Sequence, residues 1–345
     1  EVSQPGGNKE TVEFEQAIIA AGSRSISIPG FEIDGQNVLG SKEALDLSAP
    51  PAALVVIGGG VIGLEIGTFF AKLGTKVTVV EFLDALLPVI EKDMTVPVTR
   101  VLTRLGVDVH LGSKAKSWTK KGEGLEVTVE TPEGEKRILC DKVLLAVGRA
   151  PRTKDLGLAQ AGVETDKTGH ILVDTEMLTS AANIYAIGDC VGPPYLAHKA
   201  SREGVLAAQS IAGHALEPRG AVPWAVFTDP EISWVGETES EAAARGAQVL
   251  VGKFPFSASG RAQAMRETEG FCKVVAEKAS GRILGAGFVG PSAADLIGEA
   301  CLAVRLGATL RQVASTIHPP PTLNEVFVEA CEAALGQPIH VLNAR

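Results

Sequence analysis

The sequence lacks the features that mark nucleic-acid-binding and membrane proteins. It has no run rich in lysine and arginine, and its formal net charge is −9. This balance argues against nucleic acid or an anionic membrane surface as a partner. No uninterrupted apolar stretch reaches the roughly 18 residues that a membrane-spanning helix needs. We therefore predict a soluble protein with neither kind of partner.

Cysteine is scarce and irregularly spaced. The five cysteines form no C-x-x-C pair and stand at Cys140, Cys190, Cys272, Cys301 and Cys331. An odd number of distant cysteines indicates neither a disulfide framework nor a zinc site, so no metal is predicted. This usage fits a reducing compartment, and we predict a cytoplasmic protein.

The apolar residues present are sufficient for more than one core. With 345 residues, 45% hydrophobic and 21% charged, the chain is expected to form two or three globular domains. Its beginning already looks like the middle of a domain, because the apolar run at 17–20 is typical of a buried strand. We therefore expect that an N-terminal portion is missing.

The most informative stretch is a strand followed by a glycine turn and a helix. Residues 54–57 form a short apolar run, the pattern of a parallel strand buried on both faces. Gly58, Gly60 and Gly63 follow in G-x-G-x-x-G spacing. The first permits the tight turn, the second lets a pyrophosphate approach the backbone, and the third lets helix and strand pack closely. Phosphate would then meet free N–H groups at the helix N-terminus.

A second strand with an acid at its end completes the pattern. The helix is expected to run to about residue 73, and residues 76–80 form the next strand. Glu81 stands 18 residues after Gly63, where a carboxylate can accept both ribose hydroxyls of an adenosine. A glycine turn can be purely structural, but here strand, turn, helix and acid agree. The predicted dinucleotide-binding residues are Gly58, Gly60, Val61, Ile62, Gly63 and Glu81.

The acid also selects the cofactor. Glu81 would repel a 2′-phosphate, and the residues that follow it supply no cation to hold one. The sequence therefore predicts NAD rather than NADP.

The remaining patterns describe a larger α/β chain with an α+β end. A helix is expected near 93–105, a hairpin across 125–139 and a buried strand at 143–147. The loop at 28–51 is a plausible crossing between domains. From residue 221 the pattern is α+β without its own glycine-rich turn, which favours an interface or substrate module over a second nucleotide site.

Another candidate ligand residue lies at the end of a later strand. The segment NIYAIGD (183–189) delivers Asp189 at the carboxyl end of an apolar strand, next to a helix expected at about 199–211. Ligands of open α/β sheets bind at that edge. From these residues alone, however, a solvated turn acid is the simpler interpretation of Asp189.

Several segments together carry a resemblance to a known family. They are GGGVIGLE (58–65), VLLAVGRAPRT (143–153), NIYAIGD (183–189) with YLAH (195–198), FTDPEISWVGETE (227–239) and PTLNEVFVEA (321–330). They resemble the dihydrolipoamide dehydrogenases, a family of pyridine nucleotide–disulfide oxidoreductases, along essentially the whole chain. In that family an N-terminal G-x-G-x-x-G domain holds FAD and a C-x-x-x-x-C disulfide lies on the flavin's far side from NAD. A C-terminal His-Glu pair from the other subunit serves the dithiol.

The resemblance implies an α/β fold of the FAD/NAD-linked reductase type, with a parallel-sheet dinucleotide-binding domain followed by an α+β dimerisation domain. It implies that 1–45 is the tail of a FAD-binding domain, 46–150 the NAD-binding domain, 151–220 the returning FAD-binding segment and 221–345 the dimerisation domain. The chain would then be a C-terminal portion lacking the N-terminal FAD-binding half.

The resemblance adds two residues to the NAD site. The Gly148 backbone would contact NAD, and Glu65 matches the acid near the nicotinamide pocket. A first-turn helix acid favoured by the helix dipole is an equally good interpretation of Glu65.

A partial FAD site is implied by three short segments. Ala21, Gly22 and Ser23 match the family's Thr-Gly-Ser backbone contact to FAD, with Ala in place of Thr. Asp189 would bind the ribityl chain of FAD. The residues expected along the flavin are Leu196, Ala197 and His198. Without the resemblance, His198 would be a polar residue at the start of a helix.

The sequence departs from the family at two places. It contains no C-x-x-x-x-C and no flavin-binding G-x-G-x-x-G. The family's catalytic His lies five residues before its Glu in H-x-H-P-T-x-S-E, whereas here Glu325 is present and its partner position holds Pro320. His318 matches only the first, non-catalytic His. Glu325 could also complete a T-x-x-E capping box that begins at Thr322 and secures the last helix.

The resemblance implies a homodimeric dihydrolipoyl dehydrogenase that passes electrons from dihydrolipoamide through the disulfide and FAD to NAD. Its partner would be the lipoyl-bearing acyltransferase of a 2-oxo acid dehydrogenase complex. Because the disulfide and the catalytic His are absent, we predict that this chain alone is inactive.

Two alternatives remain. One is another disulfide reductase. Glu81 argues against a glutathione reductase, because those enzymes use NADP, and the Ala344-Arg345 end argues against a mercuric reductase, because it lacks the expected Cys pair. The other is a non-catalytic NAD-binding and dimerisation scaffold.

Overall fold

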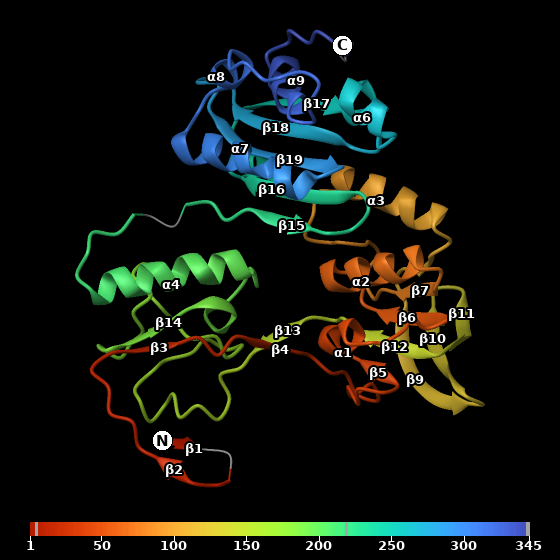
Figure 1. Ribbon diagram of the computed structural model, residues 1–345, viewed down its shortest axis with the longest axis vertical. Helices are drawn as coiled ribbons and strands as arrows, with labels where there is room; N and C mark the ends of the chain where they lie inside the picture. The colour runs from red at the N-terminus through yellow and green to blue at the C-terminus, as the bar shows by residue number, and fades with distance from the viewer. Residues whose placement is uncertain (4–5, 218–219, 343–345) are drawn as a thin grey trace. The chain divides into compact units, whose positions relative to one another are not determined.

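The chain forms two compact units in the computed structural model, which describes residues 1–3, 6–217 and 220–342 (Figure 1). The first unit is Glu1–Arg24 with Arg149–Gly220, and the second is Ser25–Gly148 with Ala221–Arg345. The Ala344-Arg345 end, which was used to argue against a mercuric reductase, lies outside the described residues. No helix in the described ranges is both long enough and apolar enough to span a lipid bilayer.

The second unit contains the parallel sheet that the sequence predicted. Its strands lie in the order β5 (Val38–Leu39), β12 (Lys142–Leu145), β6 (Ala53–Ile57), β7 (Lys76–Val80) and β8 (Asp108–His110). Strands β6, β7 and β8 follow one another outward, and β12 pairs on the other side of β6. The strand order therefore reverses between β6 and β12. Open α/β sheets bind ligands at such a reversal, outside the carboxyl ends of the strands.

Each face of this sheet has its own cover because strand side chains alternate. The covering elements are α2 (Val61–Lys72) and α3 (Lys92–Arg104) on one face, and the antiparallel strands β9 (Lys114–Lys121), β10 (Gly124–Thr131) and β11 (Gly134–Cys140) on the other. Leu54 and Val56 pack in the cluster that includes the helices, whereas Val55 and Ile57 pack with the antiparallel strands. Residues 54–57 are thus buried on both faces, as predicted.

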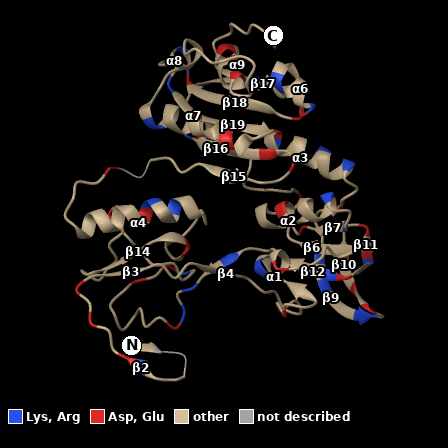
Figure 2. Ribbon diagram, in the orientation of Figure 1, with Lys and Arg blue, Asp and Glu red and all other residues tan. Residues whose placement is uncertain are grey.

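Local sequence patterns located most of these elements. The expected bounds of β6, α2, β7 and α3 are confirmed within one residue, and the hairpin of β10 and β11 is confirmed. Strand β9 was not predicted, because most of its side chains are polar and four are lysines (Figure 2). Only Ala115 in this strand is buried.

The boundary expected at residue 45 differs from the observed division. The predicted loop at 28–51 contains β5 and the short helix α1 (Ser41–Leu45), and β5 pairs in parallel with β12. Residues 25–45 therefore belong to the unit with the dinucleotide-binding sheet. A two-residue strand and a five-residue helix are too short to show a hydrophobic period, which explains why the sequence suggested a loop.

The first unit holds three two-stranded sheets. They are β1 (Val2–Ser3) with β2 (Lys9–Glu10), β3 (Ala17–Ile19) with β14 (Ile184–Ala186), and β4 (Ser23–Ser25) with β13 (Arg149–Pro151). After β14 the chain forms the 3-10 turn η1 (Gly188–Val191) and then α4 (Ala197–Ile211). The strand expected at 17–20 is present but not buried. Ile18 is 40% exposed, and none of the three residues of β3 is fully buried.

The C-terminal part of the second unit is an antiparallel sheet with helices. The strands lie in the order β15 (Trp224–Val226), β16 (Glu231–Gly236), β19 (Ile283–Gly290), β18 (Phe271–Glu277) and β17 (Val249–Pro255). The helical elements are α5 (Glu239–Ala244), η2 (Phe256–Ala258), α6 (Gly260–Met265), α7 (Ala293–Leu306), α8 (Leu310–Ala314) and α9 (Glu325–Ala334). Helices α7 and α9 pack on one face of the sheet, where Phe288 contacts Phe327. This is the α+β region that the sequence predicted.

The two parts of the second unit share a hydrophobic core. Trp234 and Val275, from the C-terminal sheet, belong to the same buried cluster as Leu87 and Met94. Beside it, the buried Lys273 ammonium lies 2.7 Å from Glu91, 3.0 Å from Asp93 and 2.8 Å from Glu239. Residues 46–148 of the expected NAD-binding region therefore form one compact unit with the region expected at 221–345, whereas Arg149 and Ala150 belong to the first unit.

Candidate functional site

The glycine turn after β6 lies at the reversal of the strand order. Gly58 has φ +109°, and a Cβ there would lie 2.4 Å from the Ala146 carbonyl oxygen at the end of β12. A Cβ at Gly63 would lie 2.1 Å from the Gly58 carbonyl oxygen. Only glycine fits at these two positions, so the tight turn and the close packing of helix on strand are those that the spacing predicted.

Gly60 differs from its neighbours because its surroundings are open. It is the N-cap of α2, and a Cβ at Gly60 would have no described atom within 4 Å. The first N–H groups of a helix, here including Val61 and Ile62, have no partner within the helix. An open space at the start of a 12-residue helix is a fitting place for a pyrophosphate group.

The Glu81 carboxylate is tied to this turn. Its Oε2 accepts the Gly59 N–H at 2.5 Å, and its Oε1 accepts the Leu83 N–H at 2.7 Å. The side chain is 8% exposed. Each carboxylate oxygen has a second lone pair, so the group can still accept hydroxyl groups. The acid at the end of β7 therefore positions the glycine turn as well, a contact that the sequence pattern did not indicate.

Glu65 reaches from α2 to the C-terminal part of the same unit. Its Oε1 accepts the N–H of Phe227 at 2.8 Å, and burial raises the pKa of this carboxyl group although the N–H bond opposes the shift. The alternative interpretation as a first-turn helix acid is wrong, because α2 begins at Val61 and has no acid in its first turn. Gly148, with φ +133°, lies after β12, and its carbonyl accepts the Ile26 N–H at 3.1 Å.

The residues expected near FAD gather in the first unit. Asp189 lies in η1 and accepts a hydrogen bond from the Ser23 hydroxyl. Arg149 donates to the Ser23 hydroxyl at 2.7 Å and to the Ser23 carbonyl at 3.1 Å, and its Nε lies 3.9 Å from the Asp189 carboxylate. Asp189 is thus held by neighbours rather than being a solvated turn acid. Sequence reasoning missed Arg149, whose only signal was its place directly after the strand end at Gly148.

The segment expected along the flavin begins α4. Leu196 is the N-cap, and Ala197 and His198 are the first helical residues, so His198 does stand at a helix start. The preceding Tyr195 hydroxyl lies 2.7 Å from Nε2 of the buried His170, a contact that the sequence did not predict. Ala21 and Gly22 precede β4, and the Gly22 carbonyl accepts an N–H at 2.9 Å.

The C-terminal candidates lie around α9. His318 Nε2 lies 2.9 Å from Glu299, which also accepts from Asn324 at 3.1 Å. Burial lowers the pKa of His318, but its hydrogen bonds to a backbone carbonyl and to Glu299 raise the pKa above its usual value. Pro320 precedes this helix in an exposed segment.

The expected capping box at the start of α9 forms only in part. Glu325 accepts the N–H of Thr322 at 2.8 Å, as a capping box requires. The Thr322 hydroxyl, however, has no hydrogen-bond partner among the described residues. Glu325 is the first residue of the helix, whereas a capping box needs it to be the third. The expectation of a reciprocal capping box is therefore corrected.

The described residues contain no group of three or more His, Cys, Asp or Glu side chains placed to hold a metal ion. All five cysteines are free, and Cys140, Cys190, Cys272 and Cys331 are buried.

Comparison with protein families assigns most of the chain. The family described as pyridine nucleotide-disulphide oxidoreductase matches residues 1–204, and the dimerisation domain of that family matches residues 222–331. The first match lends no support to the expectation that a FAD-binding half is missing.

Curated relatives and solved structures agree with this assignment. The dihydrolipoyl dehydrogenase of Haloferax volcanii is 50% identical over 341 residues, which cover 98% of this chain and 72% of the relative. That of Geobacillus stearothermophilus is 46% identical over 338 residues, with 98% and 72% covered. The crystal structure of LpdA from Mycobacterium tuberculosis has a TM-score of 0.89 at 30% identity, over 96% of this chain and 72% of that chain. These relatives support both expected cofactors, FAD and NAD. The chain therefore belongs to the dihydrolipoyl dehydrogenase family of the pyridine nucleotide-disulphide oxidoreductases.

Proposed function

We propose that this chain binds NAD at the turn between β6 and α2 and FAD as a second cofactor. It would carry these two sites of a dihydrolipoyl dehydrogenase reaction wherever the redox disulfide and the base are supplied from outside this chain. The observation that carries the proposal is the open helix start at Gly60, beside the Glu81 carboxylate and at the reversal of the strand order. The pyrophosphate of NAD would lie at Gly60 and its adenosine ribose at Glu81. Glu65 would face the nicotinamide, and the Gly148 backbone would contact the cofactor.

The first unit supplies residues that fit the ribityl chain of FAD. The Asp189 side chain is 24% exposed, so a hydroxyl group can reach it. Arg149 would hold Ser23 and Asp189 in place, and Leu196, Ala197 and His198 would lie along the flavin. Bound FAD would carry two electrons from the dithiol to NAD.

The position of the expected catalytic His holds a proline, which cannot accept the proton that the reaction requires. A dihydrolipoamide thiol must lose a proton before it attacks, and a His near neutral pH is suited to accept it. Pro320 has no titratable group. His318 is paired with Glu299, which favours a structural role for it. We therefore propose that this chain alone lacks dihydrolipoamide dehydrogenase activity.

The test compares Pro320 with Pro320→His, in this chain and in a version preceded by the N-terminal flavin domain of a relative. Dihydrolipoamide-dependent formation of NADH is measured for all four proteins. In the longer version, the Pro320→His variant should be about 10²- to 10⁴-fold faster, the contribution of one general base. Equal rates would show that position 320 is not the place of the base.

A second candidate is a non-catalytic scaffold that binds NAD and dimerises. Pro320 and the absence of C-x-x-x-x-C from the sequence favour it. Absorbance of the purified protein separates the two, because bound flavin makes a protein yellow and a scaffold for NAD alone is colourless. The lipoyl-bearing acyltransferase would be a partner only of the enzyme.

A further inference from the structure

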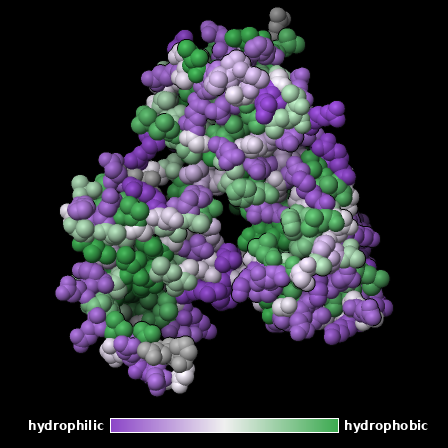
Figure 3. Space-filling view, viewed as in Figure 1, coloured by the Kyte–Doolittle hydropathy of each residue, from purple (hydrophilic) through white to green (hydrophobic). Residues whose placement is uncertain are grey.

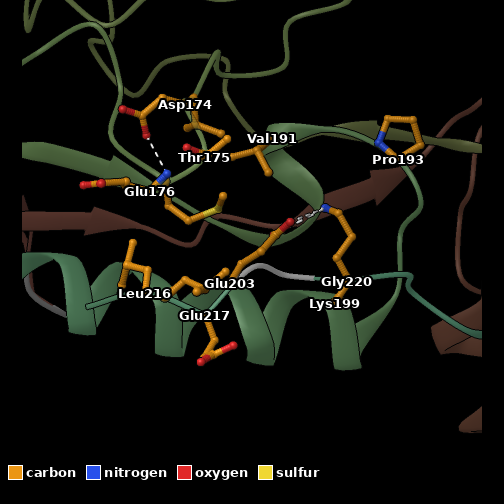
Figure 4. Close-up of a pocket in the computed structure, with 13 residues that line it drawn as sticks. Asp174, Thr175, Glu176, Val191, Pro193, Lys199, Glu203, Leu216, Glu217 and Gly220 are labelled. Carbon is orange, nitrogen blue, oxygen red and sulfur yellow. Dashed lines mark hydrogen bonds and ion pairs between the residues drawn. The ribbon is translucent and has the colours of Figure 1, made fainter. Parts of the chain in front are cut away.

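Helix α4 carries an ion pair that the proposed chemistry does not use. Lys199 is 3% exposed and Glu203 is fully buried, and the Lys199 Nζ lies 3.2 Å from Glu203 Oε1 and 3.3 Å from Oε2. The pair lines a cavity of about 860 Å³ whose lining also includes Val191 and Leu216 (Figure 4). Much of the visible face of this unit is apolar (Figure 3). A buried ion pair is weak evidence for stability, since apolar residues of similar size often serve as well.

The contacts of the pair point to a more specific role. Glu203 Oε2 accepts the N–H of Gly188 at 2.8 Å. Lys199 Nζ donates to the carbonyl of Gly192 at 3.0 Å and to that of Gly188 at 3.4 Å. Gly188 is the first residue of η1 and Gly192 is its C-cap. The pair therefore holds both ends of the turn whose second residue is Asp189.

Other contacts hold the third residue of the turn, because the Ile171 N–H donates to the Cys190 carbonyl at 2.8 Å and the Cys190 side chain is buried. Its two ends depend on Lys199 and Glu203. The turn is four residues long, and no side chain caps its N-terminus. A Cβ added at Gly188 would lie 3.2 Å from the Ala200 Cβ, so η1 packs directly on α4. A loosened pair would let η1 move against the helix and would carry Asp189 with it. Ser23 and Arg149 contact Asp189 through its side-chain carboxylate.

We propose that Lys199 and Glu203 are positioning residues, which fix the η1 backbone so that Asp189 meets the ribityl hydroxyls of FAD. This inference rests on the proposed role of Asp189. The apparent dissociation constant equals the intrinsic one divided by the fraction of chains in the competent arrangement. A turn that is correctly placed one tenth of the time would thus bind FAD about tenfold more weakly.

The experiment uses two readouts on the full chain. Hydrogen exchange of the amides at 187–192, measured without FAD, reports the order of η1. Titration with FAD, followed by flavin fluorescence, reports its affinity. The variants are Glu203→Gln, Glu203→Leu and the double variant Lys199→Met with Glu203→Leu. The double variant leaves no unpaired buried charge, so it should fold.

The double variant and Glu203→Leu should exchange the 187–192 amides at least tenfold faster and bind FAD about tenfold more weakly. Glu203→Gln keeps an oxygen for the Gly188 N–H and should retain most of the protection. The matched control is Lys273→Met, which removes an equally buried lysine from the second unit. It should lower thermal stability and leave both readouts unchanged.

The inference would be overturned if the double variant exchanged its 187–192 amides and bound FAD as the wild type does. It would also be overturned if Lys273→Met changed both readouts as much as the double variant does. If the wild-type chain takes up no FAD, the proposed function fails, and amide exchange at 187–192 still decides whether the pair holds the turn. If wild type binds FAD and the double variant binds it equally well, only the positioning role fails.

Discussion

Replacing Gly60 with alanine should weaken NAD binding without weakening the fold. A Cβ there has no described atom within 4 Å, and φ −82° with ψ −172° is an extended backbone that alanine adopts freely. Reduced flexibility of the unfolded chain stabilises such a variant by about 0.4–1 kcal/mol. Alanine is a poorer N-cap than glycine, which offsets this gain. The free energy of unfolding should therefore change by less than about 0.5 kcal/mol.

Binding responds differently because the new methyl group fills the space proposed for the pyrophosphate. Losing one hydrogen bond between a backbone N–H and a charged phosphate costs about 1.5–3 kcal/mol. Since about 1.4 kcal/mol is a factor of ten, the dissociation constant of NADH should rise about tenfold to a hundredfold.

Calorimetric titration with NADH and denaturation in urea measure the two quantities. Gly63→Ala is the matched control, because its Cβ would lie 2.1 Å from the Gly58 carbonyl oxygen. That variant must shift the turn, so it should lose stability as well as affinity. If Gly60→Ala bound NADH as tightly as the wild type, the pyrophosphate would not lie at Gly60 and the reasoning would be refuted.

Three further outcomes are expected. Glu81→Arg should weaken NADH and strengthen NADPH, because the ribose loses its acceptor and a 2′-phosphate gains a cation; a wild-type preference for NADPH would contradict this. Light scattering should give about 72 kDa, twice the 35.9 kDa of the chain, from a homodimer through residues after 221, and a monomer at micromolar concentration would oppose that proposal. The raised pKa of His318 means that its pairing with Glu299 stabilises the fold fully below about pH 6.5 and less as pH rises through the raised value. The melting temperature of wild type should thus exceed that of His318→Gln most near pH 6, and a difference that grew toward pH 9 would be inconsistent with it.

The dinucleotide-binding turn was predictable because its signals are local. The strand, the glycines, the helix and the acid lie within one short stretch, and each of these segments has a residue pattern that indicates its own local backbone conformation. The Arg149 contact with Ser23 was not predictable, because it joins residues 126 positions apart. The spacing of Lys199 and Glu203 fits an exposed helical pair equally well, and only the folded unit shows that both are buried.

Residues 149–220 separate the two sequence segments that make up the second unit. During synthesis the first of these segments is therefore complete well before the second. The strands of the parallel sheet leave the ribosome before residue 149, whereas Trp234 and Val275 emerge only after the whole inserted segment. Until then the apolar residues that will share their cluster, among them Leu87 and Met94, lack part of their cover. At about 5–20 residues per second this interval lasts seconds. Aggregation during expression would begin at this surface, and a chaperone that binds nascent chains would find its site there.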